Sequence, residues 1–205
     1  MKELPFDGSL ILYRNGERNM RPFFVAFRAA IVLMLTCGLL YPLVTTGFAQ
    51  VLFPEQANGS LIKDGKQVVG SKQLAQNFES PAFFHPRASA AGYDPKASAA
   101  TNAAVASEDY IKGVKEKTAS LVQENPSLSG DVPADLVTTS GSGFDPDLSP
   151  SAAKAQVPRI AKAKGISEEK LIELINTHTK GRQLGIFGEP RVNVLELNIA
   201  LQHLQ

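Results

Sequence analysis

The chain has 205 residues, of which 43% are hydrophobic and 20% are charged, and its formal net charge is +1. Its one cysteine, Cys37, excludes an intramolecular disulfide, so a folded domain has to be held together by an apolar core. From Pro54 onward, 16 Lys and Arg residues are balanced by 17 Asp and Glu residues without a basic run, which argues against a nucleic-acid partner.

The first predicted element is a membrane-spanning helix. Residues 29–49 are 21 uncharged, mostly apolar residues, and an α-helix of this length rises about 31 Å, which matches the roughly 30 Å hydrocarbon core of a bilayer. Five Lys and Arg residues precede this run, whereas the next one is Lys63. This basic bias predicts a cytoplasmic tail at 1–22, a transmembrane anchor at 23–53 and an external domain at 54–205.

A cleavable signal peptide is the alternative interpretation, because Gly47 and Ala49 are small residues at the two positions that a signal peptidase recognises. However, the apolar run is longer than the usual signal core of about 7–15 residues, and apolar residues resume after Gln50. A retained anchor is therefore the preferred prediction.

Within the anchor, small and hydroxylated residues favour close packing against another helix. They are Gly38, Thr45, Thr46 and Gly47, and Pro42 is expected to bend the span. Such residues are also tolerated on a lipid-facing surface, so a protein-facing role is a hypothesis about assembly.

After the anchor, short segments with β-branched residues predict a small sheet. Strands are expected at Leu61–Ile62, Gln67–Val69 and Asp135–Thr139, each near Gly or Pro. Residues 80–107 are rich in Ala, Ser, Pro and Gly with few large apolar residues, which predicts a long surface loop.

Capping residues and apolar spacing predict two helices in the middle of the chain. The first follows Ser107 and is stopped by Asn125-Pro126. The second runs from Ser149 to Gly165, and Pro158 is expected to kink it or split it.

Two further helices are predicted near the end of the sequence. Ser167 is expected to cap the third, which carries an apolar side, and Asn193 with Glu196 reads as a capping box for the fourth. The predicted fold is therefore α+β (mixed α/β), placed behind one N-terminal transmembrane helix.

Residues 138–149 concentrate serine, glycine and aspartate, residue types that can hold a nucleophile or a cation. Neither Ser140 nor Ser142 has glycines two residues away on both sides, so neither forms a nucleophile elbow. Asp145 and Asp147 lack the spacing and the distal Glu of a calcium loop. We interpret the segment as a loop bent by glycine and held by side-chain bonds to backbone N–H groups.

No catalytic residue and no metal site are predicted. The three histidines, His85, His178 and His203, lie far apart in no ligand pattern, and the sequence has no phosphate-binding loop. If the chain takes part in a reaction, another subunit performs the chemistry. Two rival interpretations stay open: an exported hydrolase that uses Ser140 or Ser142 after signal cleavage, and an anchored binding domain that works alone.

Several longer stretches of the sequence resemble the motifs of a known family and occur in the same order as in that family. They are residues 41–50, 52–54 and 56–62, Gly70-Ser71 with Phe78, residues 83–90 (Phe-Phe-His-Pro-Arg-Ala-Ser-Ala), residues 132–137 followed by 140–146 (Ser-Gly-Ser-Gly-Phe-Asp-Pro), residues 156–161 and residues 188–195. On these motifs the chain resembles the KdpC family, the C subunit of the Kdp potassium-transporting P-type ATPase. It departs from the family pattern at Ala88, at Asp147 and over 99–106.

This resemblance implies a single-span subunit of the cell (inner) membrane that has no cofactor of its own and meets ATP and potassium through its complex. The implied partners are the potassium-translocating channel-like subunit (KdpA), the P-type ATPase catalytic subunit (KdpB) and a small hydrophobic subunit (KdpF). Family accounts give the C subunit a role in assembly or in raising ATP affinity, whereas the predicted topology favours an external lid near the potassium entrance. Candidate interface or structure-fixing positions are Arg87, Ser140, Gly141, Ser142, Gly143, Asp145, Asp147 and Arg191.

Overall fold

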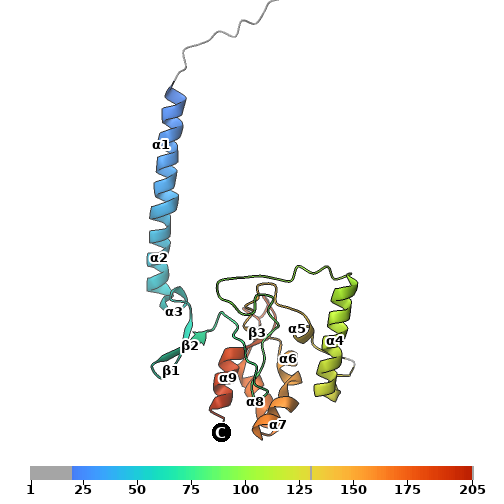
Figure 1. The fold of residues 1–205 in the computed structure, drawn as a ribbon. Coiled ribbons are helices and arrows are strands. Elements are labelled where there is room, and N and C mark those ends of the chain that lie inside the picture. The colour runs from blue at the N-terminus through green and yellow to red at the C-terminus, as the bar shows by residue number, and fades with distance from the viewer. Residues whose placement is uncertain (1–19, 130, 205) are drawn as a thin grey trace, which may run out of the picture. The chain divides into compact units, whose positions relative to one another are not determined.

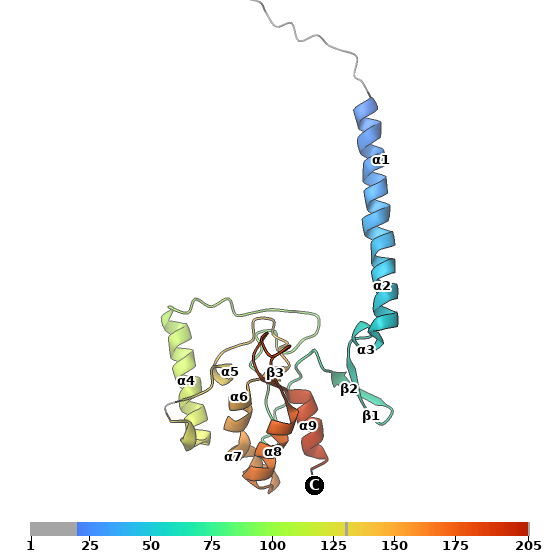
Figure 2. The same ribbon diagram turned by 180° about the vertical axis from the view of Figure 1, so that it is seen from behind.

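The computed structural model describes residues 20–129 and 131–204, and the chain divides into two compact units after Pro54 (Figures 1 and 2). The predicted cytoplasmic tail at 1–22 falls largely on residues 1–19, which lie outside the described residues. The two units are considered one at a time.

The first unit is a single helical run, Arg21–Leu52, with a mean hydropathy of 2.3 over its most apolar window. It consists of α1 (Arg21–Leu35), the π-helical turn η1 (Thr36–Leu40) and α2 (Tyr41–Leu52). None of these residues is buried inside the protein. The run is therefore long and apolar enough to cross a membrane, and the predicted anchor is a helix.

The wide turn η1 lies directly before Pro42, which has no N–H to donate and whose ring crowds the preceding turn. A π-helical turn relieves this conflict by shifting the local hydrogen-bond pattern. The expected bend does not take the form of a sharp kink, since Figure 1 shows α1 and α2 continuing along one line.

The short helix α3 (Pro54–Ala57) contains the boundary between the units, and the second unit continues with an antiparallel hairpin of β1 (Leu61–Asp64) and β2 (Gln67–Ser71). Leu61 pairs with Ser71 and Asp64 pairs with Gln67, with an irregularity after Ile62. Both predicted strands are thus confirmed.

A second, three-stranded sheet is built from very short strands in the order β3-β5-β4, all antiparallel. The strands are β3 (Asp147–Leu148), β4 (Thr179–Lys180) and β5 (Arg191–Asn193). The helices are α4 (Glu108–Glu124), the 3-10 turn η2 (Pro126–Leu128), α5 (Ala134–Val137), α6 (Pro150–Ala155), α7 (Val157–Lys164), α8 (Glu168–His178) and α9 (Val194–Gln202). This mixture confirms the predicted α+β class.

The hydrophobic core lies among α6, α7, α8, α9 and the three-stranded sheet. Its members are Phe84, Leu148, Ala152, Ala153, Val157, Ile160, Leu171, Ile175, Val192, Val194, Leu197 and Leu201. In contrast, α4 has no fully buried residue, and Figure 1 shows it at the edge of the domain. The predicted helix after Ser107 is confirmed, but its apolar side is only half-covered.

The capping predictions are confirmed in part. The Ser107 hydroxyl accepts a hydrogen bond from the backbone N–H of Tyr110, and the Asn193 side chain accepts one from Glu196. Ser167 stands at the N-cap of α8 but its side chain accepts no such bond. The carboxylate of Glu196 pairs with Lys180 instead of closing the capping box.

The predicted split of the second helix is confirmed, and the break falls at Gln156, between α6 and α7. Pro158 then stands in the first turn of α7, where a missing N–H is tolerated. Gly165 ends α7 with a positive φ of 68°, a left-handed conformation that glycine adopts without strain.

The predicted strand at Asp135–Thr139 is wrong, because Ala134–Val137 forms the helical turn α5. The Thr138 N–H and hydroxyl both donate to the carbonyl oxygen of Ala134, at 3.0 and 2.8 Å. The Asp135 carboxylate accepts from the Ser149 N–H at 2.7 Å. Local polar bonds therefore outweigh the β-branched run of Val137, Thr138 and Thr139.

The expectation that residues 80–107 form a surface loop is wrong at Phe84 and Pro86, which are both buried. The segment is irregular, but Phe84 is fully buried in the core. The buried side chain of Asn198 binds both backbone groups of Phe84: its Oδ1 accepts from the N–H at 2.8 Å and its Nδ2 donates to the carbonyl at 2.9 Å. A helix side chain thus replaces the neighbouring strand that would otherwise satisfy this buried backbone.

Replacing Asn198→Ala should lower the free energy of unfolding by about 2–4 kcal/mol, because both buried backbone groups of Phe84 lose their partner. The measurement is denaturant unfolding of the full chain in mild detergent. Asn176→Ala, at an exposed position of α8, is the matched control and should leave stability unchanged or slightly raised. Equal stability of the two variants would contradict the assigned role of Asn198.

Candidate functional site

The loop at residues 138–149 is organised around the hydroxyl of Ser140, a residue that is only 1% exposed. Its Oγ accepts from the backbone N–H groups of Gly143 at 3.1 Å, Ser142 at 3.3 Å and Asp145 at 3.4 Å. The hydroxyls of Ser140 and Ser142 lie 3.2 Å apart. Among the hydrogen bonds of the described residues, neither hydroxyl meets a histidine, so the arrangement is that of a loop-fixing serine.

Gly143 is the point where this loop meets residues 89–99. It has a φ of 78°, and a Cβ at this position would lie 2.9 Å from the Ala91 Cβ and 2.9 Å from the Ala99 carbonyl oxygen. Gly141 has open space around it. Of these two predicted glycines, only Gly143 is demanded by the backbone and by packing.

Two arginine–aspartate pairs join the loop to distant segments. Arg87 Nη1 donates to Asp145 Oδ2 at 2.9 Å, and Arg87 Nη2 donates to the Thr139 carbonyl at 3.2 Å. Arg191 Nε lies 3.0 Å from Asp147 Oδ2. The structure therefore pairs Arg87 with Asp145 and Arg191 with Asp147, a pairing that the sequence did not predict.

The carboxylate of Asp147 is half-buried. Burial raises its pKa above the usual 3.8, Arg191 opposes the rise and Asp145 adds to it. The Asp147 N–H also donates to Asp145 Oδ1 at 3.2 Å, so the two aspartates are connected through the backbone. Arg191 thus compensates a half-buried charge that would otherwise be destabilised.

The predicted anchor positions belong to the first unit. A Cβ at Gly38 or Gly47 would meet no atom within 4 Å, and the Thr45 hydroxyl donates to the Tyr41 carbonyl at 2.9 Å. Within the described chain the surface at Gly38 and Gly47 is therefore open, and the packing of another helix against it stays a prediction.

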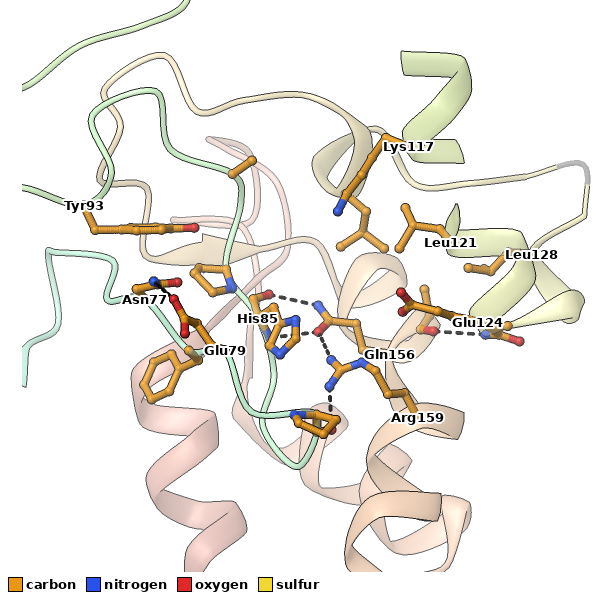
Figure 3. Close-up of a pocket in the computed structure, with 17 residues that line it drawn as sticks. Asn77, Glu79, His85, Tyr93, Lys117, Leu121, Glu124, Leu128, Gln156 and Arg159 are labelled. Atoms are coloured by element: carbon orange, nitrogen blue, oxygen red, sulfur yellow. Dashed lines mark hydrogen bonds between the residues drawn. The ribbon is translucent and has the colours of Figure 1, made fainter. Parts of the chain in front are cut away.

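A cleft of about 510 Å³, which the sequence analysis did not predict, lies between α4, the segment at 77–93 and the junction of α6 with α7 (Figure 3). Lys117 and Glu124 approach it from α4, whereas His85 and Arg159 line the opposite side. Charges of both signs and apolar side chains share its wall. The described residues contain no group of three or more His, Cys, Asp or Glu side chains that is placed to hold a metal ion.

The floor of the cleft is a fixed network centred on Gln156. Gln156 Oε1 accepts from the His85 N–H at 2.8 Å and from Arg159 Nη2 at 2.7 Å, and its Nε2 donates to the His85 carbonyl at 3.0 Å. Arg159 Nη1 also donates to the Phe83 carbonyl at 3.1 Å. These polar groups hold the chain rather than standing free for a ligand, as Figure 3 shows.

His85 is half-buried in this floor. Burial lowers its pKa below the usual 6.5; the bond to the Ser80 carbonyl opposes that change, and the nearby positive charge of Arg159 adds to it. The neutral ring is thus favoured in the folded protein. Burial also lowers the pKa of Arg159.

The signal that points to this network is the pairing of two motifs already noted in the sequence, residues 83–90 and residues 156–161. Each motif mixes apolar and polar residues, and neither by itself predicts a contact with the other. Only the fold shows that a glutamine at the α6–α7 break reaches a histidine 71 residues away.

Comparison with known proteins gives a family match over residues 23–203, to KdpC, described as the K⁺-transporting ATPase c chain. Three similar proteins bear the name potassium-transporting ATPase KdpC subunit. The one from Myxococcus xanthus is 48% identical over 182 residues, covering 87% of this chain and 86% of its own. The one from Rhodospirillum rubrum is 49% identical, covering 90% and 95%, and the one from Geobacter sulfurreducens is 47% identical, covering 90% and 99%.

Replacing Gly143→Ala should lower the free energy of unfolding by about 2 kcal/mol or more, since the new methyl group meets two neighbours in a left-handed backbone. Gly141→Ala is the matched control two residues away and should change stability by less than about 1 kcal/mol. Denaturant unfolding of both full-length variants compares them. A harmless Gly143→Ala would show that the two loops do not pack as described.

The free energy of unfolding should fall as the pH drops below about 6.5, because unfolded His85 takes up a proton before folded His85 does. His85→Gln should remove part of this fall. Unfolding curves at pH 7.5 and 5.5 measure it, with His203→Gln, at an exposed position, as the control. Parallel pH dependence in the wild type and His85→Gln would argue against a buried, neutral His85.

Proposed function

Because this chain belongs to the KdpC family of K⁺-transporting ATPase c chains, we propose that it is the accessory subunit of a high-affinity, ATP-driven potassium uptake complex. The observation that carries the proposal is a family match over nearly the whole chain, together with relatives of that name at 47–49% identity. In this role the chain supports assembly and the coupling of ATP hydrolysis to potassium movement, and it performs no hydrolysis itself.

The geometry of the 138–149 loop supports a non-catalytic role. Ser140 is buried and its oxygen is occupied by three backbone N–H groups, whereas a nucleophile needs access and an adjacent base. The aspartates are paired with Arg87 and Arg191. This arrangement favours a structural loop over the rival serine hydrolase.

The proposed partners are the channel-like potassium-translocating subunit (KdpA), the P-type catalytic subunit (KdpB) and the small hydrophobic subunit (KdpF). ATP and potassium then belong to these partners, and the chain needs no cofactor of its own. Arg21 and Arg28 lie in the first part of the apolar helix, before its uncharged run at 29–49, and no basic residue follows before Lys63, which supports an external domain. An external domain cannot meet cytoplasmic ATP, so we favour a clamp or lid near the potassium entrance.

A reporter enzyme fused after Leu61 tests this topology. A reporter that works only outside the cytoplasm should be active at this position, because the basic flank keeps the amino terminus inside. A parallel fusion of a reporter that works only in the cytoplasm is the control. Cytoplasmic activity after Leu61 would contradict the external lid and favour direct contact with ATP.

Purification from native membranes in mild detergent tests the function itself. We expect stoichiometric recovery with a P-type ATPase subunit and a channel-like subunit, and potassium-stimulated ATP hydrolysis by the recovered material. Gly47→Leu should reduce this recovery, since a bulky side chain blocks close helix approach at an open position. Val44→Leu, which enlarges a side chain that is already branched, is the control. Recovery of the wild-type chain alone would overturn the proposed function, and unchanged recovery of Gly47→Leu would overturn the packing role of the anchor.

A further inference from the structure

The loop between β4 and β5, residues 181–190, exposes three large apolar side chains within four residues. Leu184 is 88% exposed, Ile186 is 72% exposed and Phe187 is 61% exposed. In the described part of the domain, Val105 is the one other large hydrophobic residue above 60%. We call Leu184, Ile186 and Phe187 the apolar tip; in Figure 2 the loop is the red trace beside β3.

The backbone that carries the apolar tip is tightly fixed. The Gln183 N–H donates to the Phe187 carbonyl at 2.8 Å, and the Phe187 N–H donates back to the Gln183 carbonyl at 2.9 Å. Arg182 Nη2 donates to both carboxylate oxygens of Glu189 at 2.8 Å, which ties the two sides of the loop. The apolar side chains therefore stand on a pre-formed turn rather than on a free segment.

Leu184 occupies a backbone conformation that suits it poorly. Its φ is 52° and that of Gly185 is 74°, so two successive residues lie in the left-handed region, where Asn-Gly is the favoured pair. A leucine here is strained, and a side chain that is 88% exposed gains little packing within the chain to offset that strain. The benefit of this leucine must therefore come from outside the chain.

We propose that the apolar tip docks into an uncharged, apolar pocket on a neighbouring protein subunit of the transport complex. This inference rests on the proposed function, which supplies the complex. In this proposal the 181–190 loop is a docking element of the domain.

The charges around the apolar tip favour a protein pocket over a lipid surface. Arg182 is paired with Glu189, Lys180 with Glu196 and Arg191 with Asp147, so no unpaired cation of the loop or its flanking strands is left to attract anionic headgroups. A fluid bilayer also gains nothing from a fixed turn, whereas a shaped pocket binds a pre-organised loop with less loss of entropy. Exposed aromatic and aliphatic side chains in a fixed geometry are what the centre of a protein interface requires.

The test uses the full chain produced together with its complex. Replacing Leu184→Asn, Ile186→Ser and Phe187→Ser together should reduce co-purified partner subunits about tenfold or more. Leu184→Asn alone should weaken recovery while leaving the unfolding temperature of the chain unchanged or raised, because asparagine suits the left-handed turn. Val105→Ser removes an equally exposed apolar residue elsewhere and should change neither quantity.

Photo-crosslinking from a benzoylphenylalanine in place of Phe187 identifies the occupant. A crosslink to another subunit supports the proposal. Crosslinks to lipid alone, or to a second copy of this chain, overturn it, as does full recovery of the complex with the triple variant. If the wild-type chain itself purifies without partners, the proposed function has failed; if the wild type co-purifies and the triple variant does so equally, only the docking role has failed.

Discussion

Two buried amide side chains hold the domain together at the point where its irregular half meets its helical half. Asn198 of α9 binds both backbone groups of Phe84, and Gln156 at the α6–α7 break does the same for His85. A buried backbone without partners is strongly destabilising, and in the described part of the chain neither Phe84 nor His85 lies in a strand that would supply them. The amides therefore allow Phe84 to enter the core from a loop, and they determine where the loop leaves it.

The position of Arg87 follows from that attachment. Three residues after Phe84, it reaches Asp145 and the Thr139 carbonyl, while the Ser140 N–H donates to the Ala88 carbonyl at 2.8 Å. The second pair, Arg191 with Asp147, ties the same loop to β5. The serine, glycine and aspartate residues that resemble a reactive site are thus occupied in joining three segments.

Local patterns predicted the helices well and the polar connections less well. The caps at Ser107 and Asn193 are satisfied by neighbours three residues away, so the sequence carries that information directly. The predicted strand at 135–139 is wrong because the hydrogen bonds made by the side chains of Thr138 and Asp135 outweigh the β propensity of this segment. The cleft beside α4 had no local signal, since its floor joins residues that lie 71 positions apart.

The sequence by itself determined the apolar helix, the family and the α+β composition, because length, hydropathy, caps and ordered motifs are properties of neighbouring residues. It also pointed to the loop around Ser140 and to both arginines. Only the tertiary structure decided that these residues are one another's partners, that Phe84 is a core residue, and that Leu184 stands strained and exposed on a fixed turn. Burial, backbone angle and long-range hydrogen bonding depend on which distant segments meet, and no local pattern records that.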